Sequence, residues 1–362
     1  FFMIQVTKPY LPNINKYKKY IDRIYESCQL TNNGPLVQEL ENRLAEYLEV
    51  KNVILVANGT LALNIAYRAL SLKGEVITTP FSFVATTNSL ISEGLIPIFS
   101  DIDSNTFNIN PEEIRRRITS KTSAIVPVHV FGNPCEVENI QAISKENNLK
   151  VIYDAAHAFD IQYKDRSILS YGNISTLSFH STKLFHTIEG GALIVNDDDD
   201  VVKKVRQLIN FGYDGKSNLI VNAGINAKMN EFEAAMGLCI LDDISKIKSK
   251  RKDIYNIYLQ GLGKYFSFQN WNENGTRNYG YFPILLKSNE QLLLVQKKLN
   301  VNNIFPRRYF EMSLDLLSYI NNTHNCSNSQ DISKRILCLP LYNDLSIGDA
   351  KIIVSIIEEC NL

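Results

Sequence analysis

The sequence lacks the features that mark a membrane-spanning, disulfide-rich or metal-binding protein. No apolar run approaches the roughly 18 residues of a membrane span, and residues 1–17 show no basic leader followed by a long apolar block. The six cysteines form no CxxC pair and do not cluster with the five histidines, a pattern that indicates neither a zinc site nor a disulfide framework. We therefore expect no metal and a cytoplasmic location, where thiols stay reduced.

An excess of charge of either sign is also absent. The 38 Lys and Arg residues cancel the 38 Asp and Glu residues. A chain without net charge has no long-range field to attract nucleic acid or an anionic membrane. We expect neither as a partner, and local groups must hold any anionic substrate. With 362 residues and 45% hydrophobic content, the chain is long enough for a large core and two domains.

Buried-type strands alternate with helices through the first part of the chain. Continuous apolar, β-branched segments occur at 53–56, 75–79, 96–101, 123–130 and 150–154, and helical patterns separate them. This alternation predicts an α/β fold with a mostly parallel central sheet flanked by helices. Beyond about Lys246 the elements become shorter and more polar. We therefore expect a large domain over 1–245, beginning with an arm at 1–34, and a small α+β domain over 246–362.

One stretch from Ser178 to Val195, SFHSTKLFHTIEGGALIV, places a single lysine between two apolar strands. Most lysines simply stay solvated, so Lys183 alone decides nothing. Small polar residues precede it, however, and Gly190 and Gly191 follow. Glycines let a backbone pass close to a ligand. Lys183 is therefore a candidate for contact with a cofactor.

Two other positions sit where parallel sheets bind ligands, at strand ends. Asn58-Gly59-Thr60 follows a strand and opens a helix, so its free amides suit a phosphate, although the same residues are ordinary helix caps. Asp154 ends the strand VIYD and must pair with a cation or cap the following segment. His157 lies one helical turn later and either faces the same site or is structural.

Together these parts match what pyridoxal phosphate needs: a lysine for the Schiff base, an acidic partner for the ring nitrogen and a phosphate turn. The chain resembles the DegT/StrS-type nucleotide-sugar aminotransferases, a branch of the fold type I pyridoxal-phosphate enzymes. The resemblance covers nearly the whole chain and includes the segments VANGTLAL, EVITTPFSFVAT, VIYDAAHAFD, LSFHSTKLFHTIEGGALIVND, GINAKMNEFEAAMGL and FPRRYF.

The resemblance implies a role for each cofactor-binding residue. Lys183 would form the Schiff base, Asp154 would pair with the ring nitrogen, and both would be catalytic. Phe83 would stack on the ring, and His157 would touch the ring hydroxyl where many members carry glutamine. The phosphate would be held by three further residues of the same chain, Gly59, Thr60 and Ser178.

The resemblance also implies a homodimer with shared active sites, because Asn226 looks like the residue that reaches the partner subunit's phosphate. The segment PRRYF resembles the family's segment near the substrate mouth. Arg307 and Arg308 could supply positive charge to the diphosphate, although an exposed basic pair is more often solvated. Arg308 and Tyr309 are the candidate substrate-binding residues of this segment. His186 either lines the sugar pocket or simply packs.

The activity implied is transfer of an amino group, usually from glutamate, to a keto sugar carried on a nucleoside diphosphate. DAAHAFD together with SFHSTKLFHTIEGG looks closest to members that form dTDP-4-amino-4,6-dideoxyglucose for O-antigen or related glycans. A 3-keto-sugar or GDP-sugar aminotransferase would share every residue named above. A pyridoxamine-phosphate-dependent sugar dehydratase of the same fold carries histidine in place of the lysine, so Lys183 disfavours it.

Overall fold

The computed structural model describes residues 3–215, 217, 219–320 and 324–360. Its α-helices are α1 (Ile14–Ser27), α2 (Pro35–Tyr47), α3 (Gly59–Ala69), α4 (Val84–Ser92), α5 (Pro111–Arg117), α6 (Val137–Glu146), α7 (Asp199–Leu208), α8 (Glu231–Leu262), α9 (Asn289–Val301), α10 (Ser327–Arg335) and α11 (Ile347–Glu358). Short 3₁₀ helices occupy Val130–Gly132, Ile168–Ser170 and Leu314–Leu316. Its strands are β1 (Ile4–Gln5), β2 (Val53–Val56), β3 (Glu75–Thr78), β4 (Ile96–Phe99), β5 (Thr122–Val126), β6 (Lys150–Asp154), β7 (Gln162–Tyr163), β8 (Arg166–Ser167), β9 (Ile174–Ser178), β10 (Gly191–Val195), β11 (Pro283–Leu285), β12 (Ile304–Phe305) and β13 (Ile336–Cys338).

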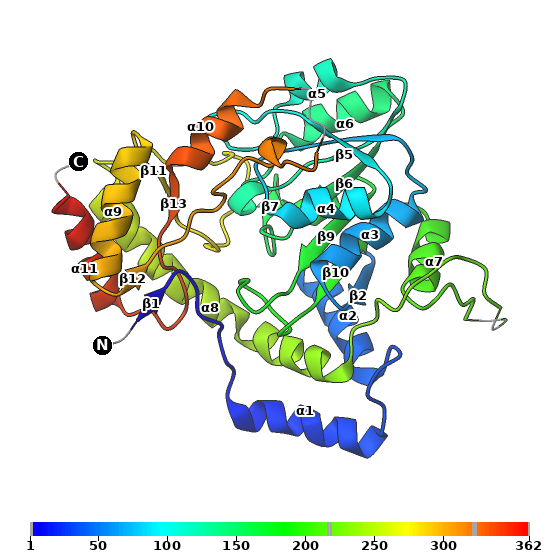
Figure 1. Ribbon diagram of the computed structural model, residues 1–362. Helices are drawn as coiled ribbons and strands as arrows, with labels where there is room; N and C mark the ends of the chain where they lie inside the picture. The colour runs from blue at the N-terminus through cyan, green and yellow to red at the C-terminus, as the bar shows by residue number, and fades with distance from the viewer. Residues whose placement is uncertain (1–2, 216, 218, 321–323, 361–362) are drawn as a thin grey trace.

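A seven-stranded sheet of order β2-β10-β9-β6-β5-β3-β4 forms the centre of the molecule (Figure 1). Strands β9, β6, β5, β3 and β4 pair in parallel, and only β10 runs antiparallel to its neighbours β2 and β9. The predicted α/β fold with a mostly parallel sheet is therefore confirmed. Strand β5 ends at Val126, earlier than the expected 123–130, because Pro127 follows and has no N–H for the ladder.

Both faces of the sheet are buried, which explains the continuous apolar strands. In β2, Val53 and Leu55 pack with α2, α6 and α8 on one face, whereas Ile54 and Val56 pack with α3 and α7 on the other. Side chains alternate between faces along a strand, so a sheet covered twice needs apolar residues at every position.

The last part of the chain builds a second core around α9, α11 and the C-terminal half of α8, with Ile254, Phe282 and Ile353 among its buried residues. Helix α8 begins at a capping box of Asn230 and Glu233 and continues without a break through residue 245. It reaches from beneath the sheet to the C-terminal elements at the left of Figure 1. The division into domains at 245/246 stays a prediction.

The N-terminal arm contacts both ends of the molecule. Strand β1 pairs in parallel with β12 near the C-terminus, and α1 packs against α8 with Ile24 buried. Among the described residues, no helix combines the length and apolar character needed to cross a bilayer.

Candidate active site

Most of the predicted site residues meet in one cavity at the carboxyl ends of β6 and β9. The cavity has a volume of about 370 Å³. Its lining includes eight of the predicted residues: Gly59, Thr60, Phe83, Asp154, His157, Ser178, Lys183 and Tyr309. Ligands of parallel sheets bind at this edge, because the loops that follow the strands gather there. The cavity is therefore the candidate active site.

Lys183 lies in the loop between β9 and β10, where its backbone N–H donates to the carbonyl of His180 at 2.8 Å. Its Nζ donates to the hydroxyl of Tyr281 at 3.2 Å. Burial lowers the pKa of Lys183 to about 8, while the charge of Asp154 opposes that shift. The amine is therefore neutral in a far larger fraction at neutral pH than an ordinary lysine, as a nucleophile requires.

Asp154 ends β6 and is 7% exposed. Its Oδ2 accepts a hydrogen bond from the Thr86 hydroxyl at 2.7 Å, and its Oδ1 accepts one from the Ala156 N–H at 3.1 Å. Burial raises its pKa, while these hydrogen bonds and Lys183 act in the other direction. In the described chain, the Asp154 carboxylate is held by these two hydrogen bonds and by no ion pair, and Lys183 acts on it only through its charge. Its negative charge is therefore free to meet a cationic group of a ligand.

The start of α3 offers backbone donors to the same cavity. The Asn58 side chain caps the helix by accepting from the Leu61 N–H at 2.9 Å. That cap leaves the N–H groups of Gly59 and Thr60, the first two of the helix, without partners in the described structure. A Cβ on Gly59 would lie 2.8 Å from the Cβ of Ser178, so only glycine permits this approach. Capping and anion binding are thus compatible functions of one turn.

Two ring-bearing residues complete the predicted set. His157 is buried, and its Nδ1 accepts from the Phe131 N–H at 3.2 Å, which assigns the ring proton to Nε2. Burial and the nearby Lys183 charge hold its pKa well below the usual value, so the ring is neutral. Phe83 stands at the N-cap of α4 with 57% of its surface exposed. An exposed phenyl ring at a cavity wall is available for stacking.

Three predicted site residues do not line this cavity. The Arg308 side chain contacts Glu311 and donates to the Ser333 carbonyl at 2.9 Å, and its neighbour Arg307 lines the cavity instead. Successive side chains of an extended segment point to opposite sides. Buried His186 pairs through Nε2 with the Tyr10 carbonyl at 2.8 Å, which anchors the arm. Exposed Asn226 accepts from the Lys228 amine at 2.8 Å.

Several lining residues escaped the sequence-based prediction, notably Thr86 and Tyr281, whereas Arg307 was considered together with Arg308 as a source of positive charge. Thr86 lies on α4, inside the segment FSFVATT, but a threonine in a helix gives no distinct signal. Tyr281 belongs to the aromatic segment YGYF, about 100 residues after Lys183, and sequence alone does not show which aromatic residue of such a segment reaches a site. Arg307 and Arg308 are adjacent, and only the direction of the backbone separates them.

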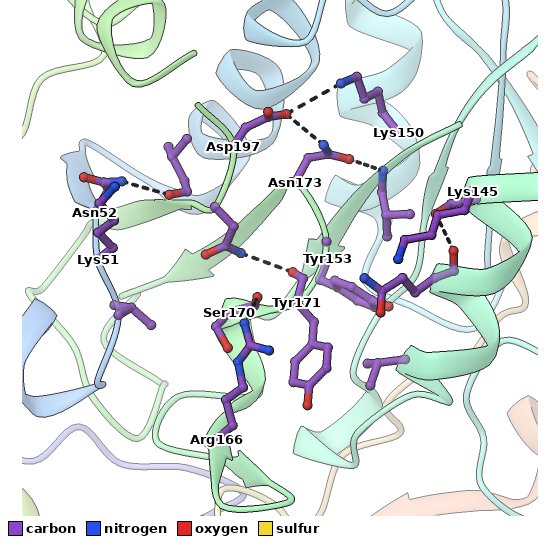
Figure 2. Close-up of a pocket in the computed structure, with 18 of the residues that line it drawn as sticks. Lys51, Asn52, Lys145, Lys150, Tyr153, Arg166, Ser170, Tyr171, Asn173 and Asp197 are labelled. Carbon is purple, nitrogen blue, oxygen red and sulfur yellow. Dashed lines mark hydrogen bonds and ion pairs between the residues drawn. The ribbon is translucent and has the colours of Figure 1, made fainter. Parts of the chain in front are cut away.

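A larger groove of about 760 Å³ lies at the opposite edge of the sheet, where β6 and β9 begin (Figure 2). Its polar groups bind one another. The Asn173 side chain accepts from the Val151 N–H at 2.9 Å and donates to Asp197 at 2.7 Å, and Lys150 lies 3.6 Å from the same carboxylate. Asn52 donates to the Val195 carbonyl at 3.1 Å. These contacts brace the sheet, and none of the predicted site residues lies among them.

A known protein family matches the chain over almost its full length. The sequence model of the DegT/DnrJ/EryC1/StrS aminotransferase family covers residues 13–358. The chain belongs to this family. The predicted family and the predicted enzyme class, an aminotransferase, are therefore confirmed.

Among the relatives that are at least 30% identical, three are matched over almost their full length. A dTDP-4-amino-4,6-dideoxy-D-glucose transaminase of Shigella dysenteriae is 43% identical, with 98% of each chain covered. One of the same name from Escherichia coli is 41% identical, with 95% of each covered. A GDP-perosamine synthase of Escherichia coli O157:H7 is 30% identical, with 93% of each covered.

Solved structures share the fold. The crystal structure of DesI in the presence of its TDP-sugar product superposes with a TM-score of 0.93 at 30% identity, covering 99% of this chain and 93% of that one. The structure of NtdA from Bacillus subtilis with bound cofactor PMP gives a TM-score of 0.88 at 26% identity, covering 96% and 81%.

Proposed function

We propose that the protein is a pyridoxal-phosphate-dependent aminotransferase that converts dTDP-4-keto-6-deoxyglucose into dTDP-4-amino-4,6-dideoxyglucose, with glutamate as amino donor. One observation carries this proposal. A half-buried amine with a lowered pKa, a buried carboxylate without an ion-pair partner in the described chain, and two free helix amides line the same cavity. The product would serve O-antigen or related glycan synthesis.

The residues fit the cofactor at each of its ends. The free amides of Gly59 and Thr60, with the Ser178 hydroxyl, suit a phosphate, and Phe83 offers a ring face for stacking. The buried carboxylate of Asp154, which has a raised pKa, would regain a favourable charge against a protonated ring nitrogen. Pyridoxal phosphate, when bound, supplies a carbonyl that takes up amino groups and a ring that withdraws electrons from the adjacent carbon.

Lys183 and Asp154 then have separate tasks. Lys183 would hold the cofactor covalently, and after the donor displaces it, its neutral Nζ would take the proton from the carbon that bears the amino group. Asp154 would hold positive charge at the ring nitrogen, where electron density builds up during that proton transfer. The neutral His157 would donate from Nε2 to the ring hydroxyl.

The substrate class rests on the relatives. The two at 41% and 43% identity are named for the 4-amino-4,6-dideoxyglucose product, and the GDP-perosamine synthase is less similar at 30%. The DesI structure, described with its TDP-sugar product, shares the fold along 99% of this chain. Arg307 and Tyr309, at the cavity wall, are suited to the negatively charged diphosphate and the sugar.

Product analysis tests this assignment directly. The purified protein is incubated with glutamate and, in separate reactions, with dTDP-, UDP- and GDP-linked 4-keto and 3-keto sugars, and the products are identified by mass spectrometry and NMR. We expect the 4-amino sugar and 2-oxoglutarate from the dTDP-linked 4-keto substrate. A deoxygenated sugar without 2-oxoglutarate would instead identify a dehydratase, and preferred amination of a GDP-linked or 3-keto sugar would identify the alternative aminotransferase.

We further propose a homodimer in which Asn226 serves the partner subunit's phosphate. Asn226 is exposed on this chain, and exposed apolar side chains of Phe211, Leu219, Ile220 and Val221 lie close to it in sequence, as an interface between copies requires.

Complementation between two inactive variants tests the shared site. Lys183→Ala and Asn226→Ala chains are co-expressed, so that about half of randomly formed dimers are mixed. If Asn226 acts on the partner, each mixed dimer contains one intact site, and about a quarter of the wild-type activity returns. If Asn226 acts within its own chain, every site carries one defect and no activity returns.

The cytoplasmic location also belongs to this proposal. All six cysteines are free, which suits a reducing compartment.

A further inference from the structure

The amine of Lys183 forms a hydrogen bond with a residue 98 positions later in the chain. Among the described residues, the only side chain that forms a hydrogen bond with Lys183 Nζ is Tyr281, whose hydroxyl accepts at 3.2 Å. Asp154 shares the cavity but forms no ion pair with the amine. The direction in which the amine points is therefore set by a phenol, not by a carboxylate.

The ring of Tyr281 is held on several sides. Its centroid lies 4.5 Å from that of His157, 5.5 Å from that of Phe131 and 5.9 Å from that of Tyr309. A ring fixed by three aromatic neighbours loses little further entropy when its hydroxyl accepts a hydrogen bond. The hydroxyl is thus presented to Lys183 before any ligand binds.

The backbone that carries Tyr281 is also fixed to the sheet side of the site. The buried Asn278 side chain donates to the carbonyls of His157 and Phe159, both at 2.9 Å, and accepts from the Gly280 N–H at 3.0 Å. Buried Arg251 of α8 donates to the Gly280 carbonyl at 3.3 Å. Tyr279 adopts a positive φ of 59°, a conformation that costs energy and persists where surrounding contacts enforce it.

We propose that Tyr281 is a positioning residue for Lys183: its hydroxyl directs the ε-amino group into the cavity and stabilises the protonated amine. This inference deepens the proposed function, since it takes Lys183 as the reacting amine. A hydrogen bond from a charged donor is stronger than one from a neutral donor. Without the hydroxyl, the ammonium form loses more than the neutral amine does, so Lys183 should give up its proton at lower pH.

Other titratable groups face the amine or Tyr281. Asp154 and Tyr309 favour the protonated amine, and Lys183 in turn disfavours protonation of His157. Arg251 and Cys338 act on Tyr281, whose pKa is raised mainly by burial. Tyr281→Phe leaves all of these groups in place and keeps the packed ring, so it removes one hydrogen bond and little else.

The test compares Tyr281→Phe with a matched control, Tyr279→Phe. Tyr279 lies in the same segment, packs on Tyr255 with centroids 5.4 Å apart, and does not line the cavity. Each full-length protein, freed of any bound cofactor, is briefly acetylated with acetic anhydride across pH 6–11, and modification of the Lys183 peptide is quantified by mass spectrometry. We expect the midpoint for Lys183 to fall by about 0.5–1 pH unit in Tyr281→Phe and to stay unchanged in Tyr279→Phe.

A second readout uses the cofactor-loaded enzyme. Tyr281→Phe should lower kcat by about tenfold and leave the KM for the sugar nucleotide within about twofold. An unchanged acetylation midpoint, an equal shift in both variants, or a rise in KM alone would overturn the positioning role. If the midpoint shifts as expected but the wild-type protein transfers no amino group, the positioning role stands and the proposed reaction fails.

Discussion

The two edges of the central sheet carry cavities of opposite character. The groove at the start of β6 and β9 is the larger, at about 760 Å³ against about 370 Å³ for the cavity at their ends. In the groove, Asn173, Asp197 and Lys150 satisfy one another. In the cavity, half-buried Lys183 and buried Asp154 have no ion-pair partner in the described structure, and their pKa values are shifted towards the neutral forms.

The difference shows that size does not identify a site here. Fold stability favours polar groups that bind each other, as in the groove. A buried charge left without a counter-charge lowers stability. Proteins keep such a group where a ligand supplies the missing counter-charge. Mutations in the cavity should therefore lower activity, and mutations in the groove should lower stability.

The largest effect is expected from removing the amine that lines the cavity. Lys183→Ala should reduce the amination rate by about 10³-fold or more, because it removes both the covalent anchor and the proton carrier. It should also abolish the visible absorption band of the cofactor-loaded enzyme. The measurements are 2-oxoglutarate release and an absorption spectrum.

The groove supplies the matched control for this prediction. Lys150→Ala removes a lysine that lies 3.6 Å from Asp197 at the other edge of the same sheet. It should leave the rate within about twofold, because partly exposed ion pairs contribute little. A large loss in Lys150→Ala, or a retained absorption band in Lys183→Ala, would contradict the assignment of the active site to the smaller cavity.

The next largest effect should come from Asp154→Asn. Asparagine keeps the shape and an oxygen for the Thr86 hydroxyl, which lies 2.7 Å from Oδ2, but it loses the charge. We expect kcat to fall by about 10²- to 10³-fold, with a much smaller change in KM, because the charge acts where electron density builds up. Steady-state kinetics decide the point, and a loss confined to KM would reduce Asp154 to a binding residue.

The sequence was informative about this site where position along a strand determines position in space. Lys183, Asp154 and Gly59 each stand next to the end of an apolar strand. Parallel strands bring such ends to one edge, so their meeting in one cavity could be anticipated. The strands themselves could be predicted because a sheet buried on both faces needs continuous apolar runs.

The rest of the site depends on side-chain directions that no local pattern specifies. Tyr281 reaches Lys183 only because Asn278 fixes its segment to the β6 side of the site. The choice of Arg307 over Arg308 depends on which way an extended segment faces. The role of Asn226 concerns a second subunit and stays a prediction.

A smaller effect is expected on the stability of the protein in acid. Buried His129 stacks on Tyr153, a residue that lines the groove, with ring centroids 4.7 Å apart. Burial lowers the pKa of His129 to about 3. The unfolded chain binds a proton below about pH 6.5 and the native chain does not, so stability is lost as pH falls from 6.5 towards 3.

Because of His129, the free energy of unfolding should be about 2 kcal/mol lower at pH 5 than at pH 7. His129→Phe retains a ring against Tyr153 but cannot titrate, so its free energy of unfolding should change by about 2 kcal/mol less between the two pH values. Urea unfolding at both pH values measures the change, and any pH-independent cost of the substitution cancels. Equal pH dependence in both proteins would show that His129 is not buried in its neutral form.

The smallest effect is expected from a mutation in the groove. Asn173→Ala removes the acceptor for the Val151 N–H and the donor to Asp197. The free energy of unfolding should fall by about 1–2 kcal/mol, while kcat and KM stay within about twofold, because these contacts hold the beginnings of the strands and not their ends. Urea unfolding and steady-state kinetics on the same preparation separate the two effects. If Asn173→Ala lost activity at unchanged stability, the groove would take part in function, and the contrast between the two edges of the sheet would fail.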